Sequence, residues 1–362
     1  MSRTKHVSTK EGKVNLIIPE GGVYDRNVFY NPEAKITRDI TIGAVQVFQK
    51  NHGDKIRVLD ALSASGVRGL RIKKEVNGVK EVTLNDKNPE AIKLIRKNVK
   101  KNNVKCTVTN KDASLLMREN IYSVIDIDPF GPPVRFLDSA ARSIYKKGLL
   151  AVTATDTAAL TGKFSGACLR KYGIKSMKTD FYNELGCRIM ISSIIKECAK
   201  YERTFIPVLT FMDKHYFRVF GIVERAGKLT KTLNEFGFVN YCECGNRNFG
   251  KLKEKCSCGK TMKHCGPIYL GKIQDKKFIK SVLTELKKRK FNEALKKIEK
   301  ICDEADLPVF YYDIHSFSVK EMRKFEDIIK DLKNKGFEAG RTHFCKTGIK
   351  TDAPLKKLRS VL

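Results

Sequence analysis

The stretch 56–72 reads Ile-Arg-Val-Leu-Asp-Ala-Leu-Ser-Ala-Ser-Gly-Val-Arg-Gly-Leu-Arg-Ile. Its apolar start, 56–62, predicts a buried strand, and the small residues at 63–66 predict a tight turn into a helix. The same order of elements recurs downstream, with strands expected at 82–85, 106–109, 123–127 and 149–154 and helices at 89–102 and 132–145. This alternation predicts an α/β fold, a doubly wound and mostly parallel sheet with helices on both faces.

The end of the sheet and the start of a second domain are also visible in the sequence. Two apolar runs, 204–212 and 216–225, are separated only by Asp213-Lys-His and predict a hairpin that adds one antiparallel strand. After residue 227 the chain becomes rich in Cys, Gly and Lys, and a strand at 309–315 and a helix at 319–334 are expected later. We therefore predict two domains, 1–225 and a smaller α+β domain at 226–362.

The composition points to a polyanionic partner. Lys and Arg number 71 against 40 acidic residues, a net charge of +31 over 362 residues, which favours capture of nucleic acid. A Lys-rich surface of the thermophilic type is the alternative explanation. The balance of 41% hydrophobic and 31% charged residues excludes a wholly disordered chain. The longest weakly polar stretch, 148–162, is too short to span a membrane, and no signal-peptide pattern is seen, so we expect a cytoplasmic protein.

The loop after the first strand, from Asp60 to Gly66, is a candidate cofactor loop. Its small residues let a ligand approach the backbone close to helix N–H groups. It lacks the Gly-x-Gly-x-x-Gly pattern, so a dinucleotide pyrophosphate fits less well than S-adenosylmethionine, which carries no phosphate. Asp86 ends the second strand, where ribose hydroxyls are bound in such sheets, although a helix N-cap is its alternative role. Asp112 and Ala113 follow the third strand, where an adenine amine would be met.

The fourth strand ends in Asp126-Ile-Asp128-Pro-Phe130-Gly. This resembles the Asp/Asn-Pro-Pro-Tyr/Phe loop of methyltransferases that modify planar amino nitrogens. In that chemistry Asp128 would hold the amine and accept its proton, and Phe130 would stack on the base. The alternative is that Asp128 is only a turn residue before prolines. The aromatic segment 28–32, which includes Phe29, could by itself be a packing arm.

Two close cysteine pairs with eleven residues between them form the strongest metal signature. They are Cys242-Glu-Cys244-Gly and Cys256-Ser-Cys258-Gly. Four thiolates on tight turns fit a tetrahedral structural zinc site with no open position. Cys265 or His264 could replace one ligand, and two disulfides or free thiols are the alternatives. We predict a zinc module near 241–266.

Taken together, several motifs resemble the tRNA guanine-26 N2,N2-dimethyltransferase family in its archaeal form. The motifs are Phe29-Tyr-Asn-Pro, Arg38-Asp, Ser65-Gly-Val-Arg-Gly-Leu-Arg, Asn85-Asp86, Asp126-Ile-Asp128-Pro-Phe-Gly, Arg341-Thr-His-Phe and Gly348-Ile-Lys-Thr-Asp. The resemblance implies that S-adenosylmethionine is contacted by Arg38, Arg68, Asp86, Asp112 and Ala113. It further implies that Asp128 is the catalytic acceptor, that Phe29 and Phe130 sandwich the target guanine, and that the C-terminal half binds zinc.

The resulting prediction is a methyltransferase that places two methyl groups on the exocyclic N2 of guanine 26 in tRNA, with no obligatory protein partner. Its expected sheet is the Rossmann-like one of class I S-adenosylmethionine-dependent enzymes. Residues 1–225 would catalyse, and the basic domain at 226–362 would hold the tRNA. Two other functions stay open on the sequence alone: an amino-nitrogen methyltransferase acting on DNA, and a non-catalytic zinc-bearing RNA-binding protein.

Overall fold

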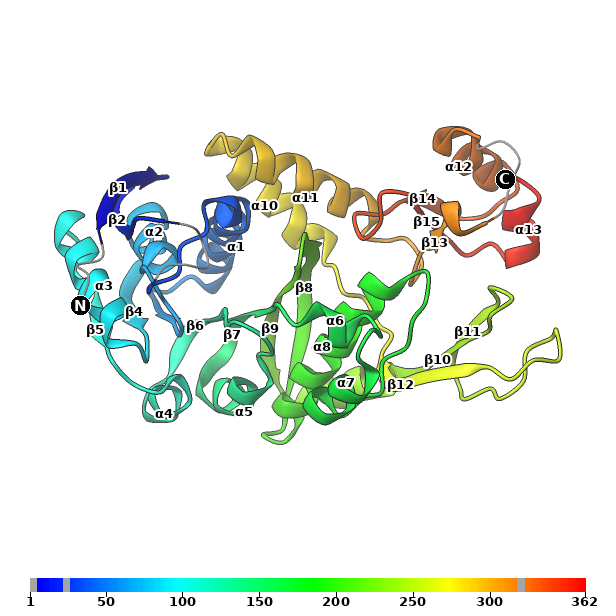
Figure 1. Cartoon of the computed structure of the whole chain (residues 1–362), viewed down its shortest axis with the longest axis horizontal. Helices are drawn as coiled ribbons and strands as arrows, with labels where there is room; N and C mark the ends of the chain where they lie inside the picture. The colour runs from blue at the N-terminus through cyan, green and yellow to red at the C-terminus, as the bar shows by residue number, and fades with distance from the viewer. Residues whose placement is uncertain (1–4, 22–26, 318–322) are drawn as a thin grey trace.

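A seven-stranded sheet forms the centre of the molecule in the computed structural model, which describes residues 5–21, 27–317 and 323–362 (Figure 1). Its strand order is β5-β4-β3-β6-β7-β9-β8. All strand pairs are parallel except β7–β9 and β8–β9, so β9 alone runs against the others. This confirms the predicted mostly parallel sheet with one antiparallel strand. The strands are β3 (Ile56–Asp60), β4 (Val79–Asn85), β5 (Thr107–Thr109), β6 (Tyr122–Ile127), β7 (Ile144–Ala154), β8 (Arg203–Asp213) and β9 (Tyr216–Arg225).

Helices cover both faces of this sheet, and each face has its own core. One core joins the sheet to α4 (Ala113–Glu119), α5 (Val134–Ser143) and α8 (Tyr182–Ala199). The other joins it to α1 (Lys35–His52) and α2 (Val67–Glu75). Alternate residues of one strand enter opposite cores: Val58 packs on the α1 side and Leu59 on the α5 side. A strand buried on both faces accounts for the apolar residues that dominate 56–62.

Local sequence signals start several of these helices. Asn88 caps α3 (Pro89–Lys101) by accepting the N–H of Glu90, and Pro89 takes the first helical position. Asp275 caps α10 (Lys276–Lys288) by accepting the N–H groups of Lys277 and Phe278. Together with α11 (Asn292–Glu304), α10 forms a helical pair that lies against α1 (Figure 1). The packing of these two helices against α1 had no signal in the sequence.

The chain after β9 builds two small sheets. The first has the order β11-β10-β12, from β10 (Phe236–Tyr241), β11 (Arg247–Gly250) and β12 (Lys263–Tyr269). The second has the order β13-β15-β14, from β13 (Tyr312–Asp313), β14 (Ala339–Arg341) and β15 (Gly348–Thr351). It packs with α12 (Phe325–Asn334) and α13 (Leu355–Arg359); part of the helix predicted at 319–334 lies outside the described residues. The division at 225/226 stays a prediction, and side chains such as Val239 and Tyr311 lie in the same core as α8.

A buried cluster of charges fixes the C-terminal segment to α8. Lys350 Nζ lies 3.1 Å from Glu184 Oε2 and 3.6 Å from Glu304 Oε2, and both carboxylates are almost fully buried. Arg188 binds Glu184 at 2.8 Å, and His343 Nδ1 contacts Glu304. The Arg341-Thr-His-Phe and Gly348-Ile-Lys stretches therefore hold the C-terminal sheet in place. In the part of the chain that the structure describes, no helix combines the length and the apolar character needed to cross a bilayer.

Candidate functional site

The carboxyl ends of four neighbouring parallel strands meet at one edge of the sheet. Because β4, β3, β6 and β7 are parallel neighbours, the residues that end them lie along the same edge. Asp60 ends β3, Asp86 follows β4, and Asp128 follows β6. Ligands of open α/β sheets bind at this edge. The structure thus brings together three of the predicted site residues.

The loop after β3 has the tight backbone that its small residues predict. Ala64 and Gly66 have φ angles of 47° and 79°, and Gly66 is the N-cap of α2. A side chain at Gly69 would place a Cβ 2.2 Å from Leu84 and 3.2 Å from the carboxylate of Asp60, so only glycine lets α2 approach β4 this closely. The N–H groups at the start of α2 therefore lie beside the ends of β3 and β4.

Asp86 organises the turn after β4. One carboxylate oxygen accepts the N–H of Ala64 at 2.8 Å, and the other accepts the N–H of Asn88 at 2.9 Å. The N-cap of α3 is Asn88, so the alternative role of Asp86 as that cap is wrong. Asp86 joins the cofactor loop to the next strand, which leaves its half-buried carboxylate at the place where a ribose is expected. Its contact with the cofactor stays a prediction.

Asp112 and Ala113 start α4 at the end of β5. Asp112 is the N-cap and accepts the N–H of Ser114 at 2.9 Å, and Ala113 is the buried first helical residue. The sequence did not show this capping role. Both residues lie after a strand that pairs in parallel with β4, so they belong to the same edge as Asp86.

Arg38 is tied to an N-terminal hairpin formed by β1 (His6–Glu11) and β2 (Val14–Pro19). Its Nε and Nη2 donate to the two carboxylate oxygens of Glu11 at 2.7 and 2.6 Å, and Nη2 also donates to the carbonyl of Asn31 at 2.9 Å. Arg71 donates to Glu11 at 2.9 Å as well and is fully buried. Arg38 is only 4% exposed and carries a two-bond ion pair, so it fixes the hairpin and the segment near Phe29.

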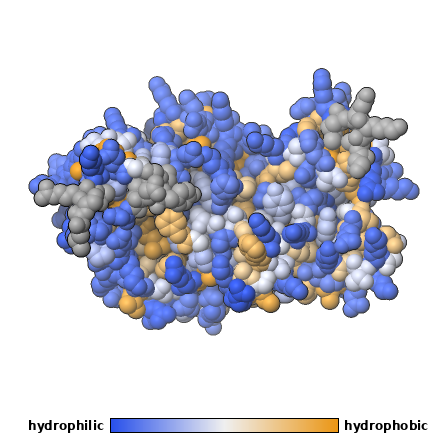
Figure 2. Space-filling view, in the orientation of Figure 1, coloured by the Kyte–Doolittle hydropathy of each residue, from blue (hydrophilic) through white to orange (hydrophobic). Residues whose placement is uncertain are grey.

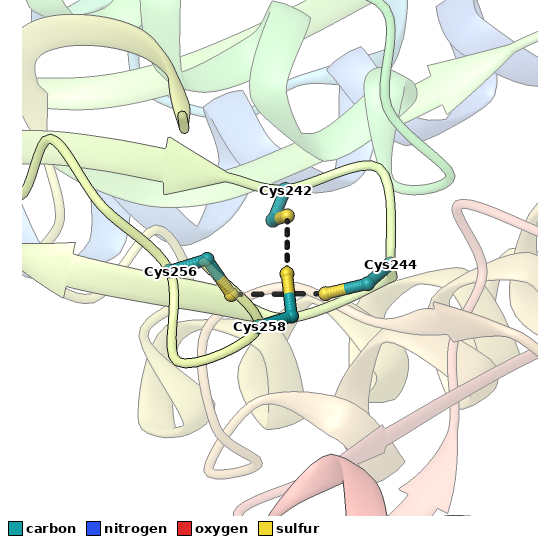
Figure 3. A group of neighbouring side chains, drawn as sticks. All are labelled: Cys242, Cys244, Cys256 and Cys258. Atoms are coloured by element: carbon teal, nitrogen blue, oxygen red, sulfur yellow. Dashed lines mark hydrogen bonds between the residues drawn. The ribbon is translucent and has the colours of Figure 1, made fainter. Parts of the chain in front are cut away.

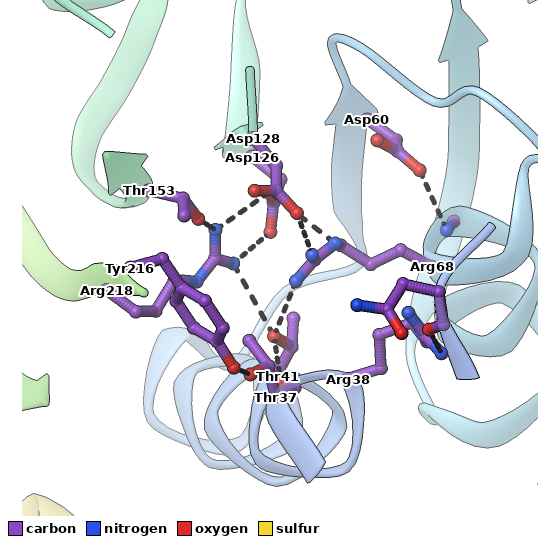
Figure 4. Close-up of polar contacts among 12 residues, drawn as sticks. Thr37, Arg38, Thr41, Asp60, Arg68, Asp126, Asp128, Thr153, Tyr216 and Arg218 are labelled. Carbon is purple, nitrogen blue, oxygen red and sulfur yellow. Dashed lines mark hydrogen bonds and ion pairs between the residues drawn. The ribbon is translucent and has the colours of Figure 1, made fainter. Parts of the chain in front are cut away.

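Asp128 belongs to a row of alternating charges (Figure 4). Arg68 donates to Asp128 through Nη2, and its Nε lies 3.7 Å from Asp126. Asp126 in turn receives both Nη groups of Arg218, at 3.1 Å for Nη1, and Arg218 also donates to Thr153 at 2.8 Å. Although burial acts to raise it, the positive charges of Arg68 and Arg218 hold the pKa of Asp128 below its usual range. Asp128 is therefore ionised and able to accept a proton, and its side chain remains 31% exposed.

Asp60 lies on the same edge of the sheet as Asp128, but its pKa is shifted in the opposite direction. Burial and the neighbouring negative charge of Asp126 raise the pKa of Asp60 to about 7, against the opposing effect of Arg68. One of its oxygens accepts the N–H of Gly69 at 3.0 Å. A strongly perturbed carboxyl at the ligand edge of such a sheet is typical of a functional site.

Phe29 and Phe130 meet above this edge. Their ring centroids are 4.6 Å apart with an interplanar angle of 82°, an edge-to-face contact. Phe130 is 65% exposed, and its loop is held by hydrogen bonds between Gly131 and Thr155. The structure brings the two predicted rings together, but they touch each other. A base can enter only if the rings separate and become parallel.

The four predicted cysteines converge in the C-terminal half (Figure 3). Their sulfurs all lie within 4.8 Å of one another, with 3.6 Å from Cys242 to Cys258 and 3.7 Å from Cys244 to Cys256. Four sulfurs held about 2.3 Å from one tetrahedral ion would lie about 3.8 Å apart, so the arrangement fits zinc. These separations are far longer than a sulfur–sulfur bond, and all cysteines are free, which excludes the disulfide alternative.

The turns that carry these cysteines are equivalent. In each, the first cysteine's carbonyl accepts the N–H of the following glycine, at 2.9 Å for both Gly245 and Gly259, whose φ angles are 91° and 83°. His264 instead contacts Asn240 at 2.9 Å, and Cys265 is buried in the core beside α8, so neither joins the group. The predicted ligand set is the one that the structure assembles.

Sequence reasoning missed the partners that surround the predicted residues. Glu11 has no motif to mark it, and Arg71 ends the motif that starts at Ser65 but was given no partner there. Arg218 had a signal, because a charged residue in the apolar strand 216–225 must find a buried partner when its neighbours face a core. Thr41 on α1 also contacts both Arg68 and Arg218, at 3.1 and 3.5 Å.

Comparison with known proteins decides the family. A model of the N2,N2-dimethylguanosine tRNA methyltransferase family matches residues 6–362. The chain belongs to this family. Curated tRNA (guanine(26)-N(2))-dimethyltransferases from Methanosphaera stadtmanae and Methanothermobacter thermautotrophicus are 37% and 38% identical to it. The alignments cover 98% of this chain and 95% and 98% of those relatives.

A solved structure agrees with the family and the fold. Trm1 from Pyrococcus horikoshii, in complex with S-adenosyl-L-methionine, superposes with a TM-score of 0.87 at 33% identity, covering 98% of this chain and 99% of that one. The predicted family and fold class are confirmed. Which side chains contact the cofactor and the base stays a prediction.

Proposed function

We propose that this chain is an S-adenosylmethionine-dependent enzyme that methylates the exocyclic N2 of guanine 26 in tRNA twice and yields N2,N2-dimethylguanosine. Family membership over residues 6–362 supports the reaction class. The observation that carries the mechanism is Asp128: an ionised, partly exposed carboxylate at the carboxyl edge of the sheet, beside two aromatic rings.

The cofactor supplies an electrophilic methyl group on a sulfonium. We assign three groups to cofactor binding: the N–H groups at the start of α2, the carboxylate of Asp86, and the start of α4 at Asp112. Asp86 accepts from Ala64 and Asn88 already, so it is held in one orientation before a ribose arrives. Such preorganisation lowers the entropy lost on binding.

The target guanine must leave the RNA stack to reach this edge. Phe130 and Phe29 then take the two faces of the base, which requires the rings to exchange their mutual edge-to-face contact for stacking on the guanine. The 65% exposure of Phe130 in the structure leaves it free to rotate toward an incoming base.

Asp128 orients the amine and takes its proton. In each round the N2–carbon bond forms as the sulfur–carbon bond breaks, and one N2 proton passes to the carboxylate. Because Arg68 and Arg218 favour the ionised form of Asp128, the acceptor is ready without prior deprotonation. The spent cofactor must leave and be replaced between the two rounds.

The tRNA is held by the basic surface of the second half of the chain. On α10 and just beyond it, the exposed side chains include Lys277, Lys280, Lys287, Lys288 and Lys290, and the acidic Glu285 of the same helix is buried against Lys50. Figure 2 shows hydrophilic residues over the outer parts of this face and apolar residues among them in the middle and on the right. We assign 1–225 to catalysis and 226–362 to tRNA binding, and we expect the enzyme to act in the cytoplasm.

Methyl transfer to unmodified tRNA tests this proposal directly. Purified protein with methyl-labelled cofactor should give N2,N2-dimethylguanosine at position 26, identified by nucleoside digestion and mass analysis. Asp128→Asn keeps the shape but cannot take the proton, so it should lose at least about 100-fold in rate while binding cofactor normally. Full activity of that variant would overturn the mechanism.

Competition separates the remaining functions. If the chain were an amino-nitrogen methyltransferase acting on DNA, duplex DNA would inhibit methyl transfer at least as well as tRNA does. Charge alone does not separate the two polymers, because both are polyanions, but only the true substrate enters the site. Failure to bind S-adenosylmethionine, with tRNA binding intact, would leave a non-catalytic RNA-binding protein. Titration calorimetry with the cofactor alone measures this.

A further inference from the structure

The segment that follows β7 forms a basic rim beside the site. It contains α6 (Thr157–Leu160) and α7 (Ser165–Tyr172), which Figure 1 shows packed on α8 after the end of β7. Since β6 and β7 are parallel neighbours, this segment starts at the same edge as Asp128. Thr155, just before α6, accepts the N–H of Gly131 at 2.6 Å and donates its own N–H to the Gly131 carbonyl at 3.2 Å. The rim is therefore joined directly to the Asp128–Phe130 loop.

Phe164 is the exposed aromatic residue of this rim, since Tyr172 is buried. It is the N-cap of α7, its ring is 56% exposed, and its N–H donates to the carbonyl of Ala158 at 3.1 Å, which fixes its backbone on α6. Lys163 Nζ lies over the ring at 5.6 Å from the centroid. One exposed phenylalanine alone is ordinary on a protein surface. Here the ring combines a backbone fixed on α6, an adjacent cation and a place in the segment that Thr155 joins to the Asp128–Phe130 loop.

The charged residues of the segment 155–180 are mostly basic. The exposed cations of the rim are Lys163, Arg170, Lys171, Lys175 and Lys178. The two acidic residues of the same stretch are already engaged. Asp156 accepts from Tyr172 at 2.6 Å and pairs with Lys171 at 3.1 Å, and Asp180 pairs with the buried Arg247 at 3.0 Å. The surface left over carries positive charge and one ring.

We propose that this rim, Lys163 to Lys178, is a second RNA contact, in which Phe164 stacks on a base next to the extruded guanine and the cations bind the flanking phosphates. The inference rests on the proposed function. Extruding one nucleotide leaves its neighbours with an uncovered face, and an aromatic ring can cover that face whatever the base is. Cations without free acidic neighbours favour RNA over a protein partner, since an RNA backbone offers a negative charge at every residue.

Three variants of the full-length protein test the stacking. Phe164→Ala should weaken tRNA binding by about 5- to 100-fold and leave cofactor affinity unchanged. Phe164→Tyr keeps a ring and should bind nearly as tightly as the native protein. Tyr145→Ala is the matched control, because Tyr145 is 53% exposed but lies at the opposite end of β7. Equal tRNA affinity for Phe164→Ala and Tyr145→Ala would overturn the inference.

A crosslink locates the contact. tRNA with 5-iodouridine on either side of the target guanine is irradiated with the native protein, and the crosslinked peptide is identified by mass spectrometry. A crosslink at Phe164 supports the inference, and crosslinks confined to other peptides refute it. If the native protein methylates tRNA, but Phe164→Ala binds tRNA normally and no crosslink forms at Phe164, only the assignment of the rim as an RNA contact fails. If the native protein methylates no tRNA, the proposed function itself fails.

Discussion

Replacing Asp60 with asparagine should make the protein more stable, and increasingly so as the pH rises. Asp60 is 2% exposed at the end of β3, and its oxygen accepts the N–H of Gly69, a bond that an asparagine oxygen can also accept. Burial and the charge of Asp126 raise its pKa from 3.8 to about 7. Between these two values the unfolded chain is ionised at this position while the folded chain still holds the proton, and this difference disfavours folding.

The magnitude follows from the pKa gap. Below about pH 4 Asp60 is protonated in both folded and unfolded chains, and its ionisation costs no stability. As the pH rises from about 4 to about 7 the unfolded chain releases this proton first, so the folded state loses about 1.4 kcal/mol per pH unit. Above pH 7 the loss levels off at about 4 kcal/mol. The Asp60→Asn variant has no proton to release at this position, so it avoids this loss.

Urea unfolding at pH 5 and pH 8 measures the effect. Between these values the stability difference between Asp60→Asn and the native protein should grow by about 2–3 kcal/mol in favour of the variant. Val58→Ala on the same strand is the control, because it removes buried volume and no titrating group, so its penalty should be the same at both pH values. A difference for Asp60→Asn that does not change with pH would refute the reasoning.

Three further results are expected. Stripping the metal with a strong chelator should release about one zinc per chain from the native protein and less from Cys258→Ser, measured with a colorimetric zinc indicator; equal zinc content in the two proteins would contradict the assigned ligand set. Arg71→Met leaves the buried carboxylates that Arg71 now contacts short of a cation, so it should cost about 3–5 kcal/mol in urea unfolding, and adding Glu11→Gln should restore part of this; no recovery in the double variant would argue against the ion-pair account. Phe130→Ala should lower turnover about 5- to 100-fold with unchanged cofactor affinity by calorimetry, and an equal fall in both would indicate misfolding instead of lost stacking.

The sheet and its ligand edge follow from the sequence because both depend on local order. Alternation of strands and helices fixes a parallel sheet, and parallel strands must place their carboxyl ends together, which is why Asp60, Asp86 and Asp128 could be grouped in advance. Exact boundaries depend on competition between elements. The helix expected at 132–145 ends at Ser143, because Ile144 already pairs with β6 in the sheet.

The partners of these residues could not be predicted, because they come from distant segments. Arg38 pairs with Glu11 in a hairpin 27 residues earlier, and Arg289 of the helical pair donates to the carbonyl of Glu75. Periodicity and propensity describe a segment by itself and say nothing about which segment covers it. The capping role of Asp112 could not be predicted either. An Asp that follows a strand can cap a helix and also contact a ligand, and the sequence shows only its position.

The contrast between Asp60 and Asp128 shows how one edge can hold two carboxyls in different states. Both lie at the carboxyl ends of parallel strands of the same sheet. Asp128 stays ionised because the guanidinium groups of Arg68 and Arg218 lower its pKa. Asp60 is buried close to the negative charge of Asp126 and keeps its proton until about pH 7. Arg218 binds Asp126 with both Nη groups, whereas Arg68 donates to Asp128 through Nη2 and lies 3.7 Å from Asp126 through Nε. Because Arg218 binds Asp126, Arg68 can donate to Asp128, and the positive charge of Arg218 also lowers the pKa of Asp128 directly, so both arginines keep the proton acceptor charged.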